Sequence, residues 1–267
     1  MDVRRLAATA GLVILLGLVP CASASLDTDR ARAAAAALDA SYGLANGLYA
    51  DDEPGTSAHA WPFSQAVAAE IAVAGLPGAD AAVRARAAAS VAALRHYRRS
   101  GVYASGHGGD VYVDDNLWIA FDLLDWSLVA HDAAAARTAR HVLGFAVAHW
   151  DPAAADPCSG GVYWTASGPN RDRNAVTTGG TALLAMRLVP VGGNVPALRW
   201  WSDRMLGWLD QCLRAPDGLY ADHIDAGGTV VPRAWSYNQG LVIGALALAA
   251  EHGDPTSLAR AQALARS

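Results

Sequence analysis

The sequence of 267 residues lacks most of the short motifs that accompany metal, nucleotide or nucleic-acid chemistry. It contains no C-x-x-C pair, no H-E-x-x-H segment and no glycine loop leading into Lys-Ser/Thr. The glycine-rich stretch at residues 106–109 lacks the preceding apolar strand that a nucleotide site needs. The net charge of −5 is spread over both signs, which leaves no basic footprint for nucleic acid or an anionic membrane. We therefore expect no metal, no cofactor and no nucleic-acid partner.

The chain also lacks an apolar run long enough to cross a membrane, although it begins with a short one. Arg4 and Arg5 precede an apolar segment at residues 6–19, and the small residues Ala22-Ser23-Ala24 follow it. This order is typical of a secretory signal peptide. We therefore expect a leader over residues 1–24 and a secreted protein, with one domain over residues 25–267 and no membrane contact after cleavage.

Cysteine is scarce, and only Cys158 and Cys212 lie beyond the predicted leader. An exported protein with two cysteines can form one disulfide. Two unpaired small core residues are an equal alternative, and the sequence leaves both open. The oligomeric state is not predicted.

Strand-like alternation is nearly absent, whereas alanine-rich segments with helical periodicity dominate the chain. This pattern predicts an all-α protein. The expected helices span residues 29–45, 62–75, 80–99, 115–130, 133–150, 174–188, 195–214, 235–251 and 255–266.

A Gly-[Leu/Val]-Tyr turn recurs at Gly47, Gly101, Gly161 and Gly218, with spacings of 54, 60 and 57 residues. Each turn follows one helix and precedes a polar loop and a second helix, so the repeating unit is an αα-hairpin. A hairpin cannot bury both its faces alone, so successive hairpins must stack. We expect an α/α toroid in which the second helices form the inner ring and their N-terminal ends meet at one mouth.

Polar and aromatic residues gather at these N-terminal ends. Amide, carboxylate and phenol groups occur at equivalent places in the four units: Gln65, Asp114, Asp115, Asn116, Asn174, Tyr237, Asn238 and Gln239. Trp61, Trp118, Trp164 and Trp235 lie in or beside the same segments, and aromatic faces with amides suit a sugar. Helix capping is the alternative role for each amide. The remaining tryptophans lie within helices and are assigned to the core: Trp126, Trp150, Trp200, Trp201 and Trp208.

The most informative pair is Asp114-Asp115, at the start of a strongly apolar helix. Acids in a first helical turn can simply cap the helix. Two neighbouring carboxylates held beside a core also repel, however, which raises the pKa of one of them. One ionised and one protonated carboxyl about 5 Å apart is the arrangement of a retaining glycoside hydrolase. Convergence of four helix ends on one mouth favours this catalytic interpretation.

The rest of that helix is predicted to be structural. One stripe is expected to pack into the core, and it consists of Leu117, Phe121, Leu124 and Leu128. Asp122 and Asp125 lie about 10 Å or more further along the helix and are expected to have structural roles.

Three motifs resemble glycoside hydrolase family 76, the endo-α-1,6-mannanases, across most of residues 29–254. They are the Tyr-x-Asp-Asp-Asn-x-Trp segment at residues 112–118, the Gly-Gly-Val-Tyr-Trp turn at residues 160–164 with Arg173-Asn174-Ala175, and residues 235–240. The resemblance implies an (α/α)6 barrel that cleaves α-1,6-linked mannose backbones with retention. By motif, Asp114 would be the nucleophile and Asp115 the general acid/base.

The resemblance also implies six hairpins, whereas this chain holds about four. We therefore expect a toroid truncated at its C-terminal side, with an open ring.

These observations predict a secreted retaining endo-α-1,6-mannanase that acts on an α-mannan polysaccharide or oligosaccharide. The expected sugar contacts are Trp61, Gln65, Asn116, Trp164, Asn174, Trp235, Tyr237, Asn238 and Gln239. Transglycosylation and a non-catalytic glycan-binding remnant are the alternatives. A metal-assisted lyase or cyclase is weaker, because the position four residues after Asp114 is Trp118 rather than an acid. The histidines in loops are expected to be solvated residues rather than ligands: His59, His107 and His223.

Overall fold

The computed structural model describes residues 22–52, 55–106, 108–152 and 158–267. Residues 1–21 of the predicted leader lie outside the described residues. The described residues form the helices α1 (Ala22–Tyr42), α2 (Ala60–Ala74), α3 (Ala81–Ala93), α4 (Val113–Val129), α5 (Ala133–Ala148), α6 (Ala175–Leu188), α7 (Val195–Cys212), α8 (Ser236–Glu251) and α9 (Pro255–Arg266). All nine predicted helices are therefore confirmed. In the part of the chain described, no helix combines the length and apolarity that crossing a membrane requires.

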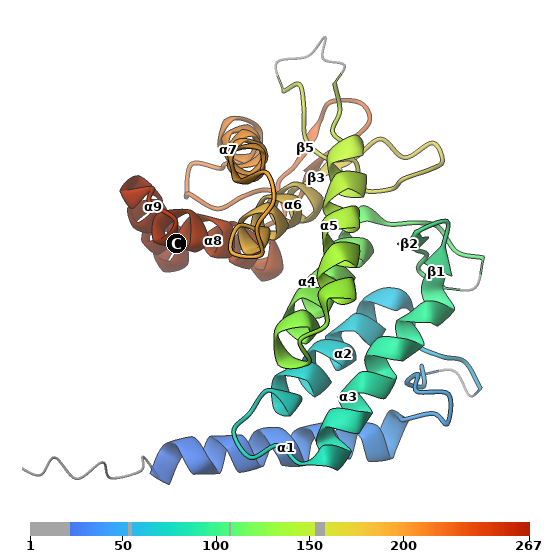
Figure 1. Cartoon of the computed structure of the whole chain (residues 1–267). Coiled ribbons are helices and arrows are strands. Elements are labelled where there is room, and N and C mark those ends of the chain that lie inside the picture. Colours follow the sequence, from blue (N-terminus) through green and yellow to red (C-terminus); the bar gives the residue numbers. More distant parts are fainter. Residues whose placement is uncertain (1–21, 53–54, 107, 153–157) are drawn as a thin grey trace, which may run out of the picture.

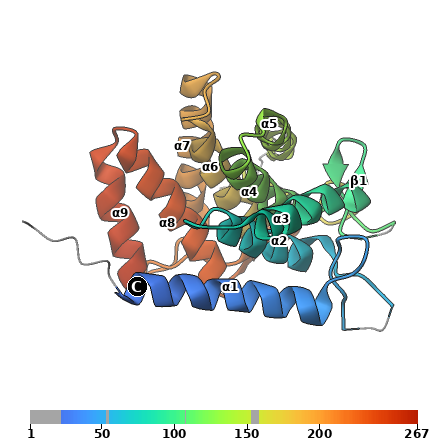
Figure 2. The ribbon, with the colours of Figure 1, turned by 60° about the horizontal axis from the view of Figure 1, so that its bottom comes forward.

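The helices form two layers, as the hairpin repeat predicts. Helices α2, α4, α6 and α8 pack in succession as an inner row, and α3, α5, α7 and α9 each pack on the outside of the inner helix before them (Figure 1). Helix α1 lies against α2, at the first end of the inner row (Figure 1 and Figure 2). Within the described residues, α8 makes no contact with α2 comparable to those along the row, so the toroid is incomplete.

The prediction of one helix over residues 80–99 is wrong at its C-terminal end. Helix α3 ends at Ala93, a 3₁₀ turn follows at Leu94–Tyr97, and β1 (Arg98–Arg99) then pairs antiparallel with β2 (Val102–Tyr103). The Tyr97 hydroxyl donates a hydrogen bond to the Ala58 carbonyl, which ties the 3₁₀ turn to the loop before α2. The other strands form a small antiparallel sheet in the order β3-β4-β5, with bounds Arg173–Asn174, His223–Ile224 and Val230–Val231.

Two predicted core residues are exposed. Leu117, Phe121 and Leu124 are buried, but Leu128 is 68% exposed, because it lies in the last turn of α4. Among the tryptophans, Trp208 and Trp150 are buried, and Trp126 and Trp201 are half-buried against the core. Trp200 is 52% exposed on the outer helix α7, where it contacts Trp201 edge to face.

The Gly-Gly pair of the third turn is required by packing. Gly160 and Gly161 both have positive φ, 104° and 84°. A Cβ on Gly160 would lie 2.4 Å from the Trp150 ring, and one on Gly161 would lie 2.5 Å from the Trp208 ring. Only glycine allows the backbone to take this conformation against two indoles. The two glycines therefore let the turn pack against Trp150, which follows α5, and against Trp208 of α7. Trp164, which lines the mouth, comes shortly after this turn.

Backbone hydrogen bonds join each hairpin to the next around the mouth. The first N–H of an α-helix has no partner within its own helix. In three inner helices it donates to a carbonyl in the turn of the following hairpin: Ala60 to Ser105 at 2.7 Å, Val113 to Trp164 at 2.9 Å and Ala175 to Asp222 at 2.8 Å. The turn residues therefore lie directly over the N-terminal ends of the inner helices.

Candidate active site

A cavity of about 290 Å³ opens at the mouth, at the N-terminal ends of the inner helices. Its lining comes from the helices α2, α4, α6 and α8 and from the turns between them. The lining residues are His59, Trp61, Pro62, Ser105, Tyr112, Asp114, Asp115, Trp118, Trp164, Val176 and Tyr237. Both aspartates predicted to be catalytic are therefore in the cavity, with Trp61, Trp164 and Tyr237 of the predicted sugar contacts.

One carboxyl oxygen of Asp114 accepts a hydrogen bond from a side chain, and the other does not. Its Oδ2 accepts a hydrogen bond of 3.2 Å from Nε1 of Trp164, whereas its Oδ1 is buried and finds no partner among the described residues. Burial raises the pKa of Asp114 to about 6, against the lowering effect of Trp164 and of the N–H groups of residues 114 and 115. Asp114 is thus the carboxyl with donors that favour its ionised form.

Asp115 has the higher pKa of the two and is the carboxyl that more readily keeps a proton. It is 7% exposed, and burial together with the charge of Asp114 raises its pKa to about 7, against a lowering contribution from the Ser105 hydroxyl. Two neighbouring carboxyls with raised pKa values titrate as a unit, and near neutrality the pair holds about one proton. The proton is favoured on Asp115, because Asp114 has the donors.

Aromatic groups form the walls. Trp164 lies over Tyr112 with 4.9 Å between ring centroids. Tyr237 stacks on Trp235 at 6.1 Å, and the two rings are almost parallel. Both rings of this pair are partly exposed, as is Trp61 on α2. Trp235 lines a neighbouring depression rather than the catalytic cavity, so the aromatic surface extends beyond the carboxylates.

Two of the predicted sugar contacts serve the backbone instead. The Asn116 amide bonds the backbone N–H and carbonyl of Tyr103 and the carbonyl of Tyr112. Gln239 occupies the same place in α8, where its amide bonds Tyr220 in the same two ways and the Trp235 carbonyl. Each amide therefore locks a Gly-x-Tyr turn onto the inner helix that follows it, and its N–H groups are already engaged.

The other predicted amides lie in two different settings. Gln65 is exposed, donates to the Ser64 hydroxyl and is not part of the cavity lining. Asn174 and Asn238 are buried, and each has an Oδ1 without a hydrogen-bond partner in the described chain. Buried carbonyl oxygens are almost always bonded, so these two acceptors without a partner are unusual, and neither residue is part of the cavity lining.

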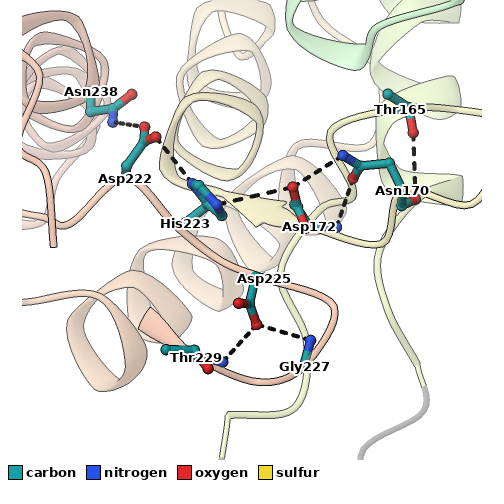
Figure 3. Close-up of polar contacts among 9 residues, drawn as sticks. All are labelled: Thr165, Asn170, Asp172, Asp222, His223, Asp225, Gly227, Thr229 and Asn238. Atoms are coloured by element: carbon teal, nitrogen blue, oxygen red, sulfur yellow. Dashed lines mark hydrogen bonds and ion pairs between the residues drawn. The ribbon is translucent and has the colours of Figure 1, made fainter. Parts of the chain in front are cut away.

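A row of polar side chains continues from Asn238 and was not predicted from the sequence. Asn238 donates to Oδ1 of Asp222 at 3.2 Å, and Oδ2 of Asp222 lies 3.0 Å from Nδ1 of His223 (Figure 3). Nε2 of His223 lies 4.0 Å from Asp172, which Asn170 also bonds. His223 is therefore held between two carboxylates, and the expectation of a solvated loop residue was wrong.

The charge of Asp222 acts on Tyr237, which lines the cavity. Burial raises the pKa of the Tyr237 hydroxyl, and the charges of Asp222 and Asp114 add to this effect. The repeat offered a signal for Asp222 and Ser105, because both stand two residues after the tyrosine of their turn. The equivalent positions in the other units are also polar, Asp51 and Thr165.

Among the residues that the structure describes, no three His, Cys, Asp or Glu side chains form a group suited to a metal ion. No disulfide joins Cys158 and Cys212, both of which are described. His59 is exposed at the edge of the cavity, and His107 lies outside the described residues.

Most glycoside hydrolases use a pair of carboxyls. The carboxyl pair at the mouth of the inner helices of an α/α toroid therefore points to the class of glycoside hydrolases. The profile of glycosyl hydrolase family 76 matches residues 25–267, and the chain belongs to this family.

Solved structures of the family share the fold. A family 76 glycoside hydrolase from a bovine Bacteroides thetaiotaomicron strain superposes with a TM-score of 0.81 at 20% identity, over 90% of this chain and 55% of that one. The α-mannanase BT2949 of Bacteroides thetaiotaomicron gives 0.78 at 19% identity, over 89% and 69%. The α-1,6-mannanase of Salegentibacter sp. HEL1_6 gives 0.74 at 20% identity, over 90% and 69%. The search of curated proteins found no match.

Proposed function

We propose that this protein is a secreted retaining endo-α-1,6-mannanase that hydrolyses α-mannan backbones through Asp114 and Asp115. The observation that carries the proposal is the buried carboxyl pair, whose two pKa values are raised to about 6 and about 7 in a cavity with aromatic walls. The Salegentibacter enzyme supports it, because an inactive variant with two consecutive aspartates replaced binds α-1,6-mannotriose. Secretion rests on the N-terminal pattern at residues 1–24.

In the first step, ionised Asp114 attacks the anomeric carbon while Asp115 gives its proton to the glycosidic oxygen. The bond between the anomeric carbon and that oxygen breaks, the shortened chain leaves as an alcohol, and a glycosyl ester forms on Asp114. The Trp164 indole fits this role for Asp114, because it donates to the carboxylate without supplying a proton.

In the second step, Asp115 is a carboxylate and acts as a base. It takes a proton from water as the water oxygen attacks the anomeric carbon, and Asp114 leaves as a carboxylate. Two inversions give a product with the anomeric configuration of the substrate. The proton returned to Asp115 restores the starting state.

Substrate contacts follow from which groups are free. Trp61, Trp235 and Tyr237 present partly exposed rings for the C–H faces of sugars. Asn174 and Asn238 offer buried acceptor oxygens for hydroxyl groups. Asp222 joins them as an acceptor that Asn238 and His223 hold in place.

The test is product analysis of residues 25–267 incubated with an α-1,6-mannan. We expect short mannooligosaccharides with the anomer retained. Asp114→Asn and Asp115→Asn should each lower kcat roughly a thousandfold or more, since each removes a group that changes charge in the transition state. Asp52→Asn, an exposed aspartate outside the cavity, is the control and should leave kcat unchanged. Product with inverted configuration, or unchanged turnover in Asp114→Asn, would contradict the mechanism.

Transglycosylation is the second candidate, since a sugar hydroxyl can replace water in the second step. The exposed Trp235–Tyr237 pair favours it, because a stacked surface beyond the carboxylates could hold an acceptor sugar. Products longer than the starting oligosaccharide, increasing with its concentration, would establish this activity. A glycan-binding protein without catalysis would instead bind mannooligosaccharides equally well in wild type and Asp114→Asn and release no product from either.

A further inference from the structure

The Ser105 side chain lies in the catalytic cavity, and the hydrolysis described above gives it no role. Ser105 and Asp115 both line this cavity of about 290 Å³. The Ser105 hydroxyl forms a hydrogen bond with the Asp115 carboxyl, which lowers the pKa of Asp115 against the raising effects of burial and of the charge on Asp114. A serine hydroxyl stays neutral and donates one hydrogen bond, so it can hold a carboxylate without changing its charge.

The backbone of Ser105 is fixed by its neighbours at the mouth. Its carbonyl accepts the N–H of Ala60, the first residue of α2, at 2.7 Å and lies 3.2 Å from Nδ1 of His59. Its own N–H donates to the Asp110 carbonyl at 2.9 Å. All three contacts are made by main-chain atoms of Ser105. A substitution at this position therefore removes the hydroxyl and leaves the attachment of the loop in place.

A second set of contacts brings Ser105 to α4. The side chain of Asn116 accepts the N–H of Tyr103 at 2.8 Å and donates to the carbonyl of the same residue at 2.8 Å. Ser105 follows Tyr103 by two residues, and Asp115 precedes Asn116 by one. The bond between Asn116 and Tyr103 therefore holds the segment of Ser105 beside the helical turn that carries Asp115.

The fourth hairpin repeats this arrangement with different side chains. Gln239 bonds the N–H and the carbonyl of Tyr220 as Asn116 bonds those of Tyr103. The residue two positions after Tyr220 is Asp222, and the residue before Gln239 is Asn238. These two side chains are joined by a hydrogen bond of 3.2 Å from Nδ2 of Asn238 (Figure 3). The positions that correspond to Ser105 and Asp115 thus meet in another hairpin as well.

We propose that Ser105 is the positioning residue of the general acid/base, and that its hydroxyl holds the carboxylate that forms when Asp115 gives up its proton. The inference rests on the proposed function and adds a regulator of the same site. In the first step Asp115 protonates the glycosidic oxygen, and Ser105 then donates to the resulting carboxylate. In the second step Asp115 takes a proton from water, and Ser105 keeps its own. The second hairpin thereby controls the acid/base, as Trp164 of the third acts on the nucleophile.

The test is the pH dependence of kcat/KM in Ser105→Ala. Without the hydroxyl, Asp115 should keep its proton to higher pH, so the basic limb should move up by about one pH unit while the acidic limb stays in place. Ser105→Thr retains a hydroxyl and should restore the wild-type limb. Ser127→Ala is the control, because the Ser127 hydroxyl lies on the same helix but bonds the Leu124 carbonyl. It should keep the wild-type profile.

The inference is overturned if Ser105→Ala keeps both limbs at an unchanged thermal midpoint, or if only its KM changes, which would make Ser105 a substrate contact. A Ser105→Thr profile that matches Ser105→Ala would also overturn it. If wild type hydrolyses no mannan at any pH, the proposed function fails by itself. The contact is then tested by carbon-13 NMR titration of the aspartate carboxyls, with the Asp115 signal assigned from Asp115→Asn. The pKa of Asp115 should be higher in Ser105→Ala than in wild type, and equal values would refute the role of Ser105.

Discussion

The Trp164 indole separates the roles of the two carboxyls at the mouth. Burial raises the pKa of both Asp114 and Asp115, and burial alone would leave their order to small differences in exposure. Trp164 donates only to Asp114, and the N–H groups at the start of α4 act on the same carboxyl. Hydrogen bonds to a charged acceptor favour the ionised form. Under the proposed mechanism, a side chain from the third hairpin therefore decides that Asp114, rather than Asp115, is the nucleophile.

The pH dependence of kcat/KM should be bell-shaped and narrow. The acidic limb reports ionisation of the nucleophile and falls near pH 6, and the basic limb reports loss of the acid's proton and falls near pH 7. Because the two carboxyls are coupled, both limbs belong to the pair. Initial rates with a soluble mannooligosaccharide from pH 4.5 to 8.5 would measure both. Full activity above pH 8.5 would show that Asp115 is not the acid.

Trp164→Phe should move the acidic limb to higher pH. The substitution removes a donor that stabilises ionised Asp114, so the pKa of Asp114 rises and the bell narrows from its acidic side. A hydrogen bond to a charged group contributes about 1.5–3 kcal/mol, so kcat/KM at pH 6 should fall roughly tenfold or more. Trp61→Phe is the comparison: it makes no hydrogen bond with Asp114, and whatever its effect on KM, it should leave the acidic limb in place. Equal limb shifts in both variants would exclude a specific role for Trp164.

At the scale of the elements, the side chain at the fourth position after the N-cap holds the preceding turn in three of the inner helices, α4, α6 and α8. Asn116 and Gln239 occupy this position in α4 and α8 and bond both polar groups of a turn tyrosine. In α6 the position is Thr178, whose hydroxyl accepts the N–H of Val162. The sequence shows amides at equivalent places but not which way they point. Both amides that the sequence offered as sugar contacts bond the preceding turn in the structure.

Asn116→Ala should destabilise the protein strongly. It leaves the N–H and carbonyl of Tyr103 buried and unpaired, each at a cost of about 1–3 kcal/mol, so the unfolding free energy should fall by about 3 kcal/mol. Gln239→Ala should cost a similar amount for the same reason. Gln65→Ala, at an exposed amide, should change it by less than about 0.5 kcal/mol. Urea unfolding followed by circular dichroism measures all three, and an Asn116→Ala protein as stable as Gln65→Ala would refute the lock.

Gly161→Ala tests the packing of the third turn. The new Cβ would meet the Trp208 ring at 2.5 Å while the residue keeps a positive φ, so strain and overpacking together should cost about 3 kcal/mol. Gly168→Ala is matched in backbone conformation, with φ 89°, but its Cβ would meet nothing within 4 Å. It should cost only about 1 kcal/mol. Equal losses in thermal unfolding would mean that φ alone, not the Trp208 contact, requires glycine.

At the scale of the whole molecule, what the sequence predicted well is what short segments determine. Alanine-rich helical periodicity and the Gly-x-Tyr turns are local, so all nine helices and the two layers follow from them. Exposure depends on which neighbours pack over a residue, which is why Trp200 and Leu128 were assigned wrongly to the core. The row from Asn238 to Asp172 joins segments far apart in the chain, and no local pattern placed it.

The acids of α4 make the stability of the whole fold depend on pH. Burial raises the pKa of Asp114, Asp115 and Asp122 above the usual value for an aspartate, in Asp122 well above it. Between about pH 4 and pH 7 the folded state therefore binds more protons at these sites than the unfolded state does. The unfolding free energy changes with pH in proportion to the number of protons bound by the unfolded state minus the number bound by the folded state. This difference is negative here, so the slope is negative between about pH 4 and pH 7. These acids lower stability as the pH rises from 4 to 7. Asp254, whose pKa is lowered to about 2, acts in the opposite sense and only below this window.

Asp115→Asn should show how much the buried carboxylate of Asp115 lowers the unfolding free energy. The amide carries no charge, so the variant should be more stable than wild type at pH 7.5, by about 2 kcal/mol, and its decline from pH 5 to pH 7.5 should be shallower. Asp52→Asn, fully outside the site, should keep the wild-type slope. Chemical unfolding at several pH values measures the three proteins together. A wild type that gains stability from pH 5 to 7.5, or an Asp115→Asn slope equal to wild type, would mean that the pair is not held with a proton. The stabilised variant should also be inactive. The buried charge at the mouth would then lower stability at a position that the proposed activity needs, a trade-off that is common in active sites.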